Sequence, residues 1–237
     1  MKNIKNNLSI SLVIPTYNDE KTVIQQIIKC ENILKNFSDN YEIIIADDYS
    51  QDNTRKLLLE NFEKRKKYKI ILNNKNLGIS GNVRQLYLLA KNNYIFFYSA
   101  DGDWNPNDTK LMIQTLLRDN ADIVIGKRNK KIGYTFYRNA LSFFHKLLPL
   151  ILFGVDTIDP GGIKIIKKQL AQIPLVSTSQ FFEAEIIIKA KQNGYKISWC
   201  SVTYKKTFYG SGHGGAISSA LRALIDVFKL RFTTFLS

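Results

Sequence analysis

The sequence is poor in the residues that build disulfide frameworks and metal clusters. Its 237 residues include only two cysteines, two histidines and five prolines. Cys30 and Cys200 have neither a metal-ligand spacing nor the pattern of a disulfide scaffold. This content excludes a small disulfide-stabilised fold, and it fits a protein of a reducing compartment.

Long hydrophobic runs are also missing. The longest, from Leu147 to Val155, is interrupted by Pro149 and Gly154, whereas a spanning helix needs about 20 apolar residues. The apolar run at 8–14 follows two lysines as in a signal peptide, but no small-residue cleavage site comes after it. We therefore expect no membrane-spanning segment, and we interpret the N-terminal run as a first β-strand.

Acidic residues are too few to balance the basic ones. The chain has 34 Lys and Arg against 20 Asp and Glu, a formal charge of +14. Such an excess can indicate nucleic acid, an anionic membrane surface or phosphorylated substrates, or it can serve only solubility. With 45% hydrophobic residues, a chain of this length can bury roughly 70% of its unfolded surface. One domain with an appendage is the expected organisation.

The hydrophobic pattern of the first half alternates between two periods. Strand-like runs lie at 11–14, 41–46, 68–72, 94–98 and 122–125, and helical patterns lie between them at 20–36, 52–66, 79–92 and 107–119. Several runs are apolar on both faces, as buried parallel strands are. The pattern predicts an α/β fold with a mixed, mainly parallel sheet and helices on both faces. A strand at 163–166, a helix at 180–193 and a strand at 195–204 follow.

Polar residues come directly after the predicted strands, where doubly wound sheets bind their ligands. Asp47 and Asp48 follow the second strand, and Asp101 and Asp103 follow the fourth. The chain contains no glycine-rich dinucleotide or P-loop motif. Two carboxylates at this spacing can bind one Mg²⁺ or Mn²⁺ that also bridges a diphosphate. An ordinary acidic turn, or a phosphatase with Asp101 as nucleophile, are the alternatives.

The chain carries a series of short motifs in a fixed order: Val13–Asp19, Ile45–Thr54, Asn76–Gly78, Ala100–Asp103, Asp122–Arg128, Gly162–Lys164, Glu185 in its helix, and the glycine-rich loop from Gly210. Together these motifs resemble the family 2 glycosyltransferases of GT-A fold, and within them the branch of dolichyl-phosphate mannose synthase and the bacterial polyprenyl-phosphate glycosyltransferases. The resemblance covers about residues 9–215. It implies a catalytic domain over 1–215, followed by a C-terminal amphipathic helix over 216–237.

The resemblance implies a role for each matching residue. Pro15, Tyr17 and Asp19 would border the base and ribose; Asp47 and Asp48 would hold the nucleotide sugar; Asp101 and Asp103 would bind the metal; Arg128 would meet the diphosphate; and Arg138, Lys206, Ser211 and His213 would meet the diphosphate or the acceptor. Two positions depart from the family pattern. Ser99 replaces the first aspartate of the metal motif, and the loop 207–213 lacks the family's two cations.

The implied reaction is an inverting, metal-dependent transfer from a nucleoside-diphosphate sugar. A lipid phosphate acceptor is already anionic and needs no strong base, whereas a hydroxyl acceptor on a glycan needs a carboxylate to take its proton. Glu185 is the first candidate for that base and Glu183 the second. Both could instead be structural residues of their helix.

Cations and aromatic residues gather in the second half. Residues 127–168 contain nine Lys and Arg against two Asp, mixed with aromatic and leucine residues. Helices at about 133–153 and at the C-terminus are therefore predicted to lie on an anionic membrane surface, although they could pack on the domain or on another subunit. We expect a peripheral protein of the cytoplasmic membrane face, with a possible separate membrane-protein partner and no nucleic acid. A non-enzymatic basic binding module is the alternative from another class.

Overall fold

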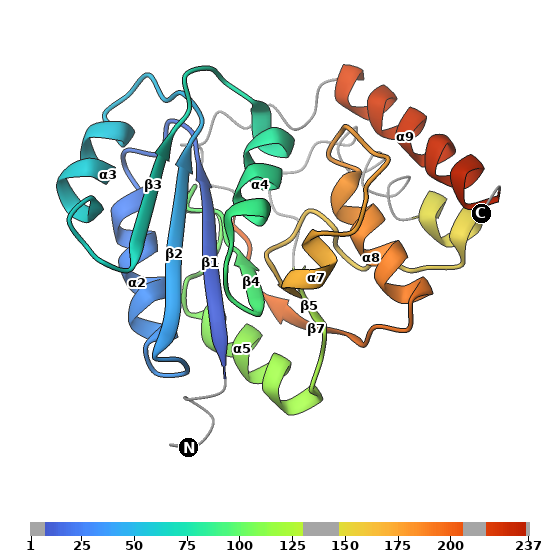
Figure 1. The fold of residues 1–237 in the computed structure, drawn as a ribbon, viewed down its shortest axis with the longest axis horizontal. Coiled ribbons are helices and arrows are strands. Elements are labelled where there is room, and N and C mark those ends of the chain that lie inside the picture. Colours follow the sequence, from blue (N-terminus) through green and yellow to red (C-terminus); the bar gives the residue numbers. More distant parts are fainter. Residues whose placement is uncertain (1–7, 130–146, 206–216, 236–237) are drawn as a thin grey trace.

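The computed structural model describes residues 8–129, 147–205 and 217–235, and shows a central sheet between two layers of helices (Figure 1). The strands are β1 (Ser9–Thr16), β2 (Asn40–Asp47), β3 (Tyr68–Leu72), β4 (Tyr94–Phe97), β5 (Ile123–Arg128), β6 (Lys164–Lys167) and β7 (Ile197–Val202). Their order in the sheet is β3-β2-β1-β4-β6-β5-β7. Strand β6 alone runs antiparallel to its two neighbours, β4 and β5.

The helices divide between the two faces of the sheet. They are α2 (Val23–Leu34), α3 (Thr54–Phe62), α4 (Gly78–Leu89), α5 (Asp108–Asp119), α7 (Lys168–Ala171), α8 (Phe182–Gln192) and α9 (Ile217–Phe235). Helices α2, α3 and α5 share one buried cluster with the sheet, and α4, α8 and α9 share the other. Residues 147–153 are also helical. None of the helices in the described part of the chain is long and apolar enough to span a bilayer.

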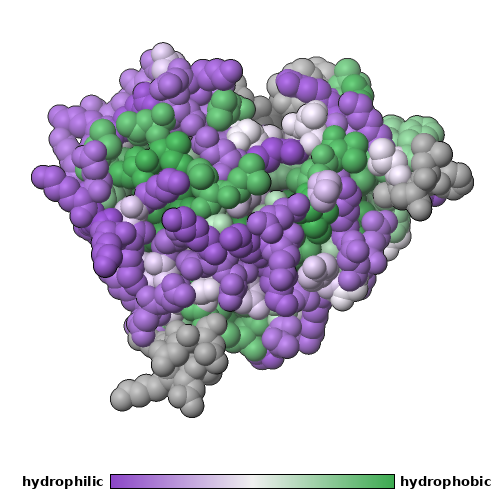
Figure 2. All heavy atoms as spheres, viewed as in Figure 1, coloured by the Kyte–Doolittle hydropathy of each residue, from purple (hydrophilic) through white to green (hydrophobic). Residues whose placement is uncertain are grey.

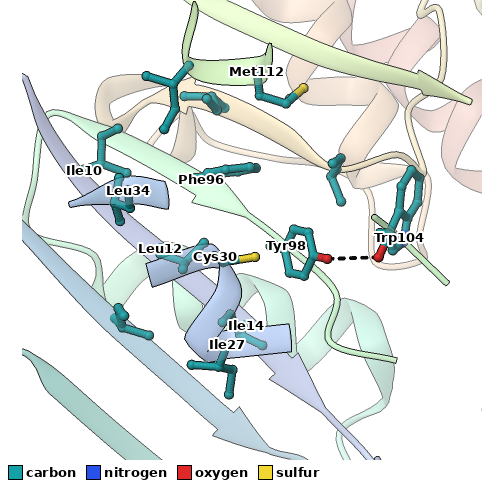
Figure 3. Packing of buried hydrophobic residues seen from close by; sticks show 14 of the residues in the cluster. Ile10, Leu12, Ile14, Ile27, Cys30, Leu34, Phe96, Tyr98, Trp104 and Met112 are labelled. Carbon is teal, nitrogen blue, oxygen red and sulfur yellow. Dashed lines mark hydrogen bonds between the residues drawn. The ribbon is translucent and has the colours of Figure 1, made fainter. Parts of the chain in front are cut away.

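The alternation along β1 explains how both layers attach to the same strands. Ile10, Leu12 and Ile14 point into the cluster beneath α2, where Figure 3 shows them facing Ile27 and Leu34. Val13 points to the opposite face and packs with α4. Burying apolar side chains on both faces stabilises a strand that has no exposed side.

The predicted fold class is confirmed: the sheet is mixed and mainly parallel, and helices cover both of its faces. The boundaries differ from the predicted ones by one to three residues at most strand ends. The central place of antiparallel β6, between β4 and β5, was not predicted. Strand order depends on long-range pairing, which hydrophobic periodicity does not encode.

Candidate functional site

The loops that follow β1 and β2 are joined by hydrogen bonds at the carboxyl edge of the sheet. The Asn18 N–H donates to Ser50 Oγ at 2.9 Å, and the Asp19 N–H donates to Thr54 Oγ1 at 2.8 Å. Asn18 and Tyr49 both adopt left-handed backbone conformations, with φ of 55° and 67°. Such conformations are costly for residues other than glycine and concentrate at functional sites.

A cavity of about 140 Å³ opens where these loops meet the end of β4. Its lining residues are Asn18, Asp19, Glu20, Lys21, Thr22, Asp52 and Asp101. Thr22 connects the two sides, because its hydroxyl donates to the carbonyl of Ala100 at 2.7 Å. The structure therefore brings together Asp19 and Asp101, two predicted site residues that are far apart in the sequence.

Asp101 and Asp103 lie in a tight turn directly after β4. Gly102 between them has a φ of 84°, a backbone conformation that favours glycine. The Asp103 N–H donates to Asp101 Oδ1 at 3.0 Å. Burial, and then the charge of Asp103, raise the pKa of Asp101 to about 6. The charged form of Asp101 is therefore unfavourable here in the absence of a cation.

A buried core residue, Tyr98, holds the turn after β4 in place. The Tyr98 hydroxyl lies 3.1 Å from the carbonyl oxygen of Trp104 (Figure 3) and 2.6 Å from Gln26 Oε1. Tyr98 is buried beneath the turn, beside Cys30 of α2. A buried hydroxyl that reaches across the turn fixes its far end, so Asp101 and Asp103 have a rigid base.

Asp47 and Asp48 are buried at the end of β2 and have different partners. Asp48 Oδ1 accepts hydrogen bonds from the Leu77 N–H at 2.8 Å and from Asn73 Nδ2 at 3.0 Å. Asp47 Oδ2 lies 2.8 Å from Arg55 Nε. Asp47 Oδ1 is buried and has no hydrogen-bond partner among the described residues. Asp47 is fully buried, so this oxygen lies behind the surface of the site.

Pro15 and Tyr17 border the same edge. Pro15 lies within β1 and is paired in register with Ala46. Tyr17 follows the strand, is partly exposed, and donates its N–H to Asp19 Oδ2 at 3.0 Å. Tyr17 therefore lies in the loop that carries Asp19, and Pro15 lies at the end of the strand before it.

Arg128 lies at the end of β5 and forms a two-pronged ion pair with Asp159. Its Nε donates to Asp159 Oδ2 at 2.8 Å, and its Nη2 contacts Asp159 Oδ1. Its guanidinium also stacks on Trp104 and Tyr204, 5.8 and 5.3 Å from the ring centroids. The predicted diphosphate contact of Arg128 stays a prediction. Arg138, Lys206, Ser211 and His213 lie outside the described residues.

Glu185 is buried in α8, and its carboxylate is fully engaged. It accepts hydrogen bonds from the Val176 and Ser177 N–H groups at 2.8 Å, and it pairs with Lys189 at 2.7 Å. Burial would raise its pKa, but these donors outweigh burial and lower it. A carboxylate with a lowered pKa is a weak base. These contacts favour the structural role for Glu185 over the catalytic one.

The second base candidate, Glu183, also has a buried partner. Its Oε2 lies 2.7 Å from Lys164 Nζ, and the Tyr87 hydroxyl lies 3.3 Å from the same oxygen. Lys164 also donates to the Pro160 carbonyl at 2.7 Å. This pair was not predicted, although Lys164 belongs to the Gly162-Ile-Lys164 motif. Lys164 therefore joins α8 to the loop that carries Asp159.

The pKa of the Asp19 carboxyl predicts how the stability of the protein depends on pH. Burial raises its pKa to about 7, opposed by the Tyr17 N–H and assisted by the charges of Asp101 and Asp52. The unfolded carboxyl ionises near pH 4 but the folded one only near pH 7, so folding binds a proton in between. We expect the metal-free protein to lose stability, on the order of a few kcal/mol, as the pH rises from 4 to 7.

Urea unfolding of the wild type and of Asp19→Asn at pH 5 and pH 8 measures this effect. Asparagine keeps an acceptor for the Tyr17 N–H but does not titrate, so the variant should lose much less stability between the two pH values. An equal loss in both proteins would contradict the assignment to Asp19.

Several known proteins are similar to this chain. Dolichyl-phosphate beta-glucosyltransferase ALG5D of Trichomonas vaginalis is 24% identical over 95% of this chain and 74% of its own length. UDP-Glc:alpha-D-GlcNAc-diphosphoundecaprenol beta-1,3-glucosyltransferase WfgD of Escherichia coli is 30% identical over 63% of this chain and 58% of its own length.

Among solved structures, glucosyl-3-phosphoglycerate synthase of Mycobacterium tuberculosis, in complex with Mn²⁺, UDP and glucosyl-3-phosphoglycerate, has the same fold. It superposes with a TM-score of 0.73 at 14% identity, over 97% of this chain and 81% of its own. The family model described as "Glycosyl transferase family 2" matches residues 11–173, more than half of the chain. The protein is a glycosyltransferase, and it belongs to glycosyl transferase family 2.

Proposed function

We propose that the protein transfers glucose from UDP-glucose to a polyprenyl phosphate at the cytoplasmic face of the membrane. The observation that carries this proposal is the turn at the carboxyl end of β4 that carries Asp101 and Asp103, of which Asp101 lines the same cavity as Asp19. The relatives named as dolichyl-phosphate and diphosphoundecaprenol glucosyltransferases support the sugar and the lipid. Two free, buried cysteines fit a reducing compartment.

The chemistry of the donor set fits a divalent metal that arrives with the nucleotide. In the described part of the chain no three His, Cys, Asp or Glu side chains are grouped to hold a metal ion. Mg²⁺ and Mn²⁺ sites of substrate diphosphates use one or two carboxylates, and the remaining ligands are phosphate oxygens and water. Asp101 and Asp103 would supply those carboxylates. The metal, when bound, would neutralise the charge of the departing diphosphate.

The strand ends would hold the nucleotide beside this pair. Asp47, buried at the end of β2, would hold the base and sugar side of the donor. Pro15, Tyr17, Asp19 and Asp48 would shape the surrounding wall. Arg128, whose guanidinium is paired with Asp159, would lie near the diphosphate.

The transfer itself would be a direct displacement at the anomeric carbon. An anionic phosphate oxygen of the lipid attacks this carbon, and the bond to the diphosphate breaks on the opposite face, so the configuration inverts. No proton has to be removed from such an acceptor. The buried, fully engaged Glu185 is therefore consistent with a phosphate acceptor.

A sugar hydroxyl on a lipid diphosphate is the second candidate acceptor. The similarity to the Escherichia coli enzyme, whose name specifies a beta-1,3 linkage to a lipid-linked GlcNAc, favours it. This reaction requires a base. Among the described carboxylates near the cavity that are not assigned to the metal, Asp19 has a pKa raised to about 7, which suits proton transfer better than the lowered pKa of Glu185 does.

Helix α9 would attach the protein to the membrane. Its inner face is buried against the domain through Ala223, Val227 and Leu230. The opposite face is apolar and remains exposed by 40–68%; it consists of Leu221, Leu224, Ile225, Phe228 and Phe232. Figure 2 shows hydrophobic side chains along the edge of the molecule where Figure 1 places α9.

Charge and position indicate what covers this outer face. Arg222, Lys229 and Arg231 lie on the flanks of α9 between its two apolar faces and are exposed. Leu150 and Ile151 of the 147–153 helix are also exposed, by 45% and 67%. An apolar face between cations is the arrangement of a helix that lies in an anionic headgroup layer. A separate membrane-protein partner is the alternative occupant.

Vesicle flotation tests the outer face of α9. The wild type should float with phosphatidylglycerol vesicles at low salt. Phe228→Ser combined with Phe232→Ser should reduce the bound fraction at least about tenfold, since burying each phenylalanine contributes about 1.5–3 kcal/mol. The matched control is Leu88→Ser, which changes a leucine of α4 that is 73% exposed. Binding of the double variant at the wild-type level would contradict the proposed surface.

The transfer reaction is tested with labelled donors and a lipid acceptor. Purified protein is incubated with radiolabelled UDP- or GDP-sugars, undecaprenyl phosphate and Mn²⁺, and the mixture is extracted with organic solvent. Label from UDP-glucose should enter the organic phase. Label that stays aqueous with every donor would exclude a lipid product.

A further inference from the structure

The end of β7 supports the turn that carries Asp103. Residues 203–205 run antiparallel to 103–105, with an isolated bridge between Trp104 and Tyr204. The Lys205 N–H donates to the Asp103 carbonyl at 2.9 Å, and the Asn105 N–H donates to the Thr203 carbonyl at 3.3 Å. The backbone of Asp103 is therefore fixed by a segment about one hundred residues later in the sequence.

The side chain of Asp103 is held from the same direction. The Tyr204 hydroxyl donates to Asp103 Oδ2 at 3.0 Å. We propose that Tyr204 is a positioning residue that orients the Asp103 carboxylate toward the metal and diphosphate. The inference rests on the proposed function, because it assumes that Asp103 is a metal ligand.

The Tyr204 ring has little freedom to move. It is buried and meets the Trp104 ring edge-on, with centroids 4.9 Å apart and planes at 64°. The Arg128 guanidinium lies over it at 5.3 Å, and Asp159 holds that guanidinium through two contacts. A donor on a ring fixed by packing and by a cation is preorganised, so its hydrogen bond requires little ordering.

The hydrogen bond from Tyr204 also fixes the orientation of the Asp103 carboxylate. Oδ2 accepts the Tyr204 hydroxyl, and the fixed direction of that bond sets the rotation of the whole carboxylate. A carboxylate that could rotate freely would lose orientational entropy on binding a cation, whereas this one has already lost it. Hydrogen-bond partners of metal ligands typically change metal affinity by about 10–100-fold when they are removed.

Further contacts link the surroundings of Tyr204 to helix α8. Asp159 holds Arg128, while Lys164 holds the adjacent Pro160 carbonyl and, at its other contact, Glu183. Arg128, which the family resemblance assigns to the diphosphate, thus also lies over the Tyr204 ring.

Tyr204→Phe removes the hydroxyl and keeps the ring. We expect it to weaken Mn²⁺ binding about tenfold, measured by calorimetry in the presence of saturating UDP, while UDP binding without metal and the thermal midpoint stay close to wild type. The matched control is Tyr68→Phe. Tyr68 also donates a hydroxyl to a carboxylate, Glu31 Oε2 at 2.7 Å, but it lies on β3, so its removal should leave Mn²⁺ affinity unchanged.

A double-mutant cycle separates positioning from a general structural role. In the Asp103→Asn background, Tyr204→Phe should cause no further loss of Mn²⁺ affinity, because the carboxylate that it orients is gone. Wild-type Mn²⁺ affinity in Tyr204→Phe, together with weakened binding in Asp103→Asn, would overturn the role of Tyr204 alone. Unchanged Mn²⁺ binding in both Asp101→Ala and Asp103→Asn would overturn the proposed metal site, and this inference with it.

Discussion

Asp101→Ala is expected to lower kcat/KM for sugar transfer by about 10³-fold. Asp101 lines the cavity beside Asp19, and its pKa is raised by burial and by Asp103, so a bound cation would relieve an unfavourable charge there. Loss of one preorganised electrostatic contact to a developing charge typically lowers the rate by about 10²–10³-fold, and Asp101 also binds the donor in this proposal. Initial rates with UDP-glucose at saturating Mn²⁺ measure the effect.

Two further variants show whether the lower kcat/KM comes from loss of the Asp101 charge or from loss of the folded structure. Asp101→Asn keeps the size of the side chain and an oxygen acceptor for the Asp103 N–H, but it should be nearly as inactive as the alanine variant. Asp39→Ala removes an exposed carboxylate just before β2, at the opposite edge of the sheet, and should retain full activity. Asp101→Ala with activity within a factor of about three of wild type would contradict the assignment.

Lys164→Ala should lower the free energy of unfolding by about 3–5 kcal/mol, more than any other single substitution proposed for this protein. The Lys164 side chain is fully buried, and its ammonium lies 2.7 Å from Glu183 Oε2. Removing it leaves the Glu183 carboxylate buried without its ion-pair partner, although the Tyr87 hydroxyl stays within 3.3 Å, and removes the donor to the Pro160 carbonyl. Urea unfolding monitored by circular dichroism measures the free energy of unfolding.

The same strand provides the control. Lys167 of β6 pairs with Asp122, but its side chain is 38% exposed, and exposed ion pairs contribute about 0–1 kcal/mol. Lys167→Ala should therefore cost less than about 1 kcal/mol. Pairing Lys164→Met with Glu183→Gln, which leaves no unpaired charge, should recover part of the stability lost in Lys164→Ala. Equal losses in the Lys164 and Lys167 variants would contradict the account.

The sheet and the place of the site could be predicted from the sequence. Runs such as Tyr94–Tyr98 are apolar and bounded by polar residues, and parallel strands bring their carboxyl ends to one edge. Asp19, Asp47, Asp48 and Asp101 therefore had to approach one another once the strands were recognised. The structure confirms the fold and shows two of these residues on one cavity.

The pairing of individual side chains could not be predicted. The contacts of Asp47 with Arg55, Arg128 with Asp159, and Asp103 with Tyr204 depend on side-chain directions within loops. No periodicity encodes these directions. Glu185 illustrates the limit, because its helix was predicted but its burial against residues 176–177 was not.

The terminal helix shows the same limit in another form. Its apolar pattern predicted an amphipathic helix, and α9 lies at that position. The residues that pack on the domain are, however, Ala223, Val227 and Leu230, opposite the larger apolar residues of the pattern. Helix α9 is apolar on two sides, and the domain covers only one of them. The apolar pattern of the sequence does not identify which side packs on the domain.

The most direct test of the proposed activity is the fate of labelled glucose from UDP-glucose. With wild-type protein, undecaprenyl phosphate and Mn²⁺, label should enter the organic phase in proportion to the lipid added, and it should fall to background with Asp101→Ala. With Asp39→Ala it should match the wild type. Label that remains aqueous, or that enters a glycan when the lipid is omitted, would contradict transfer to a polyprenyl phosphate.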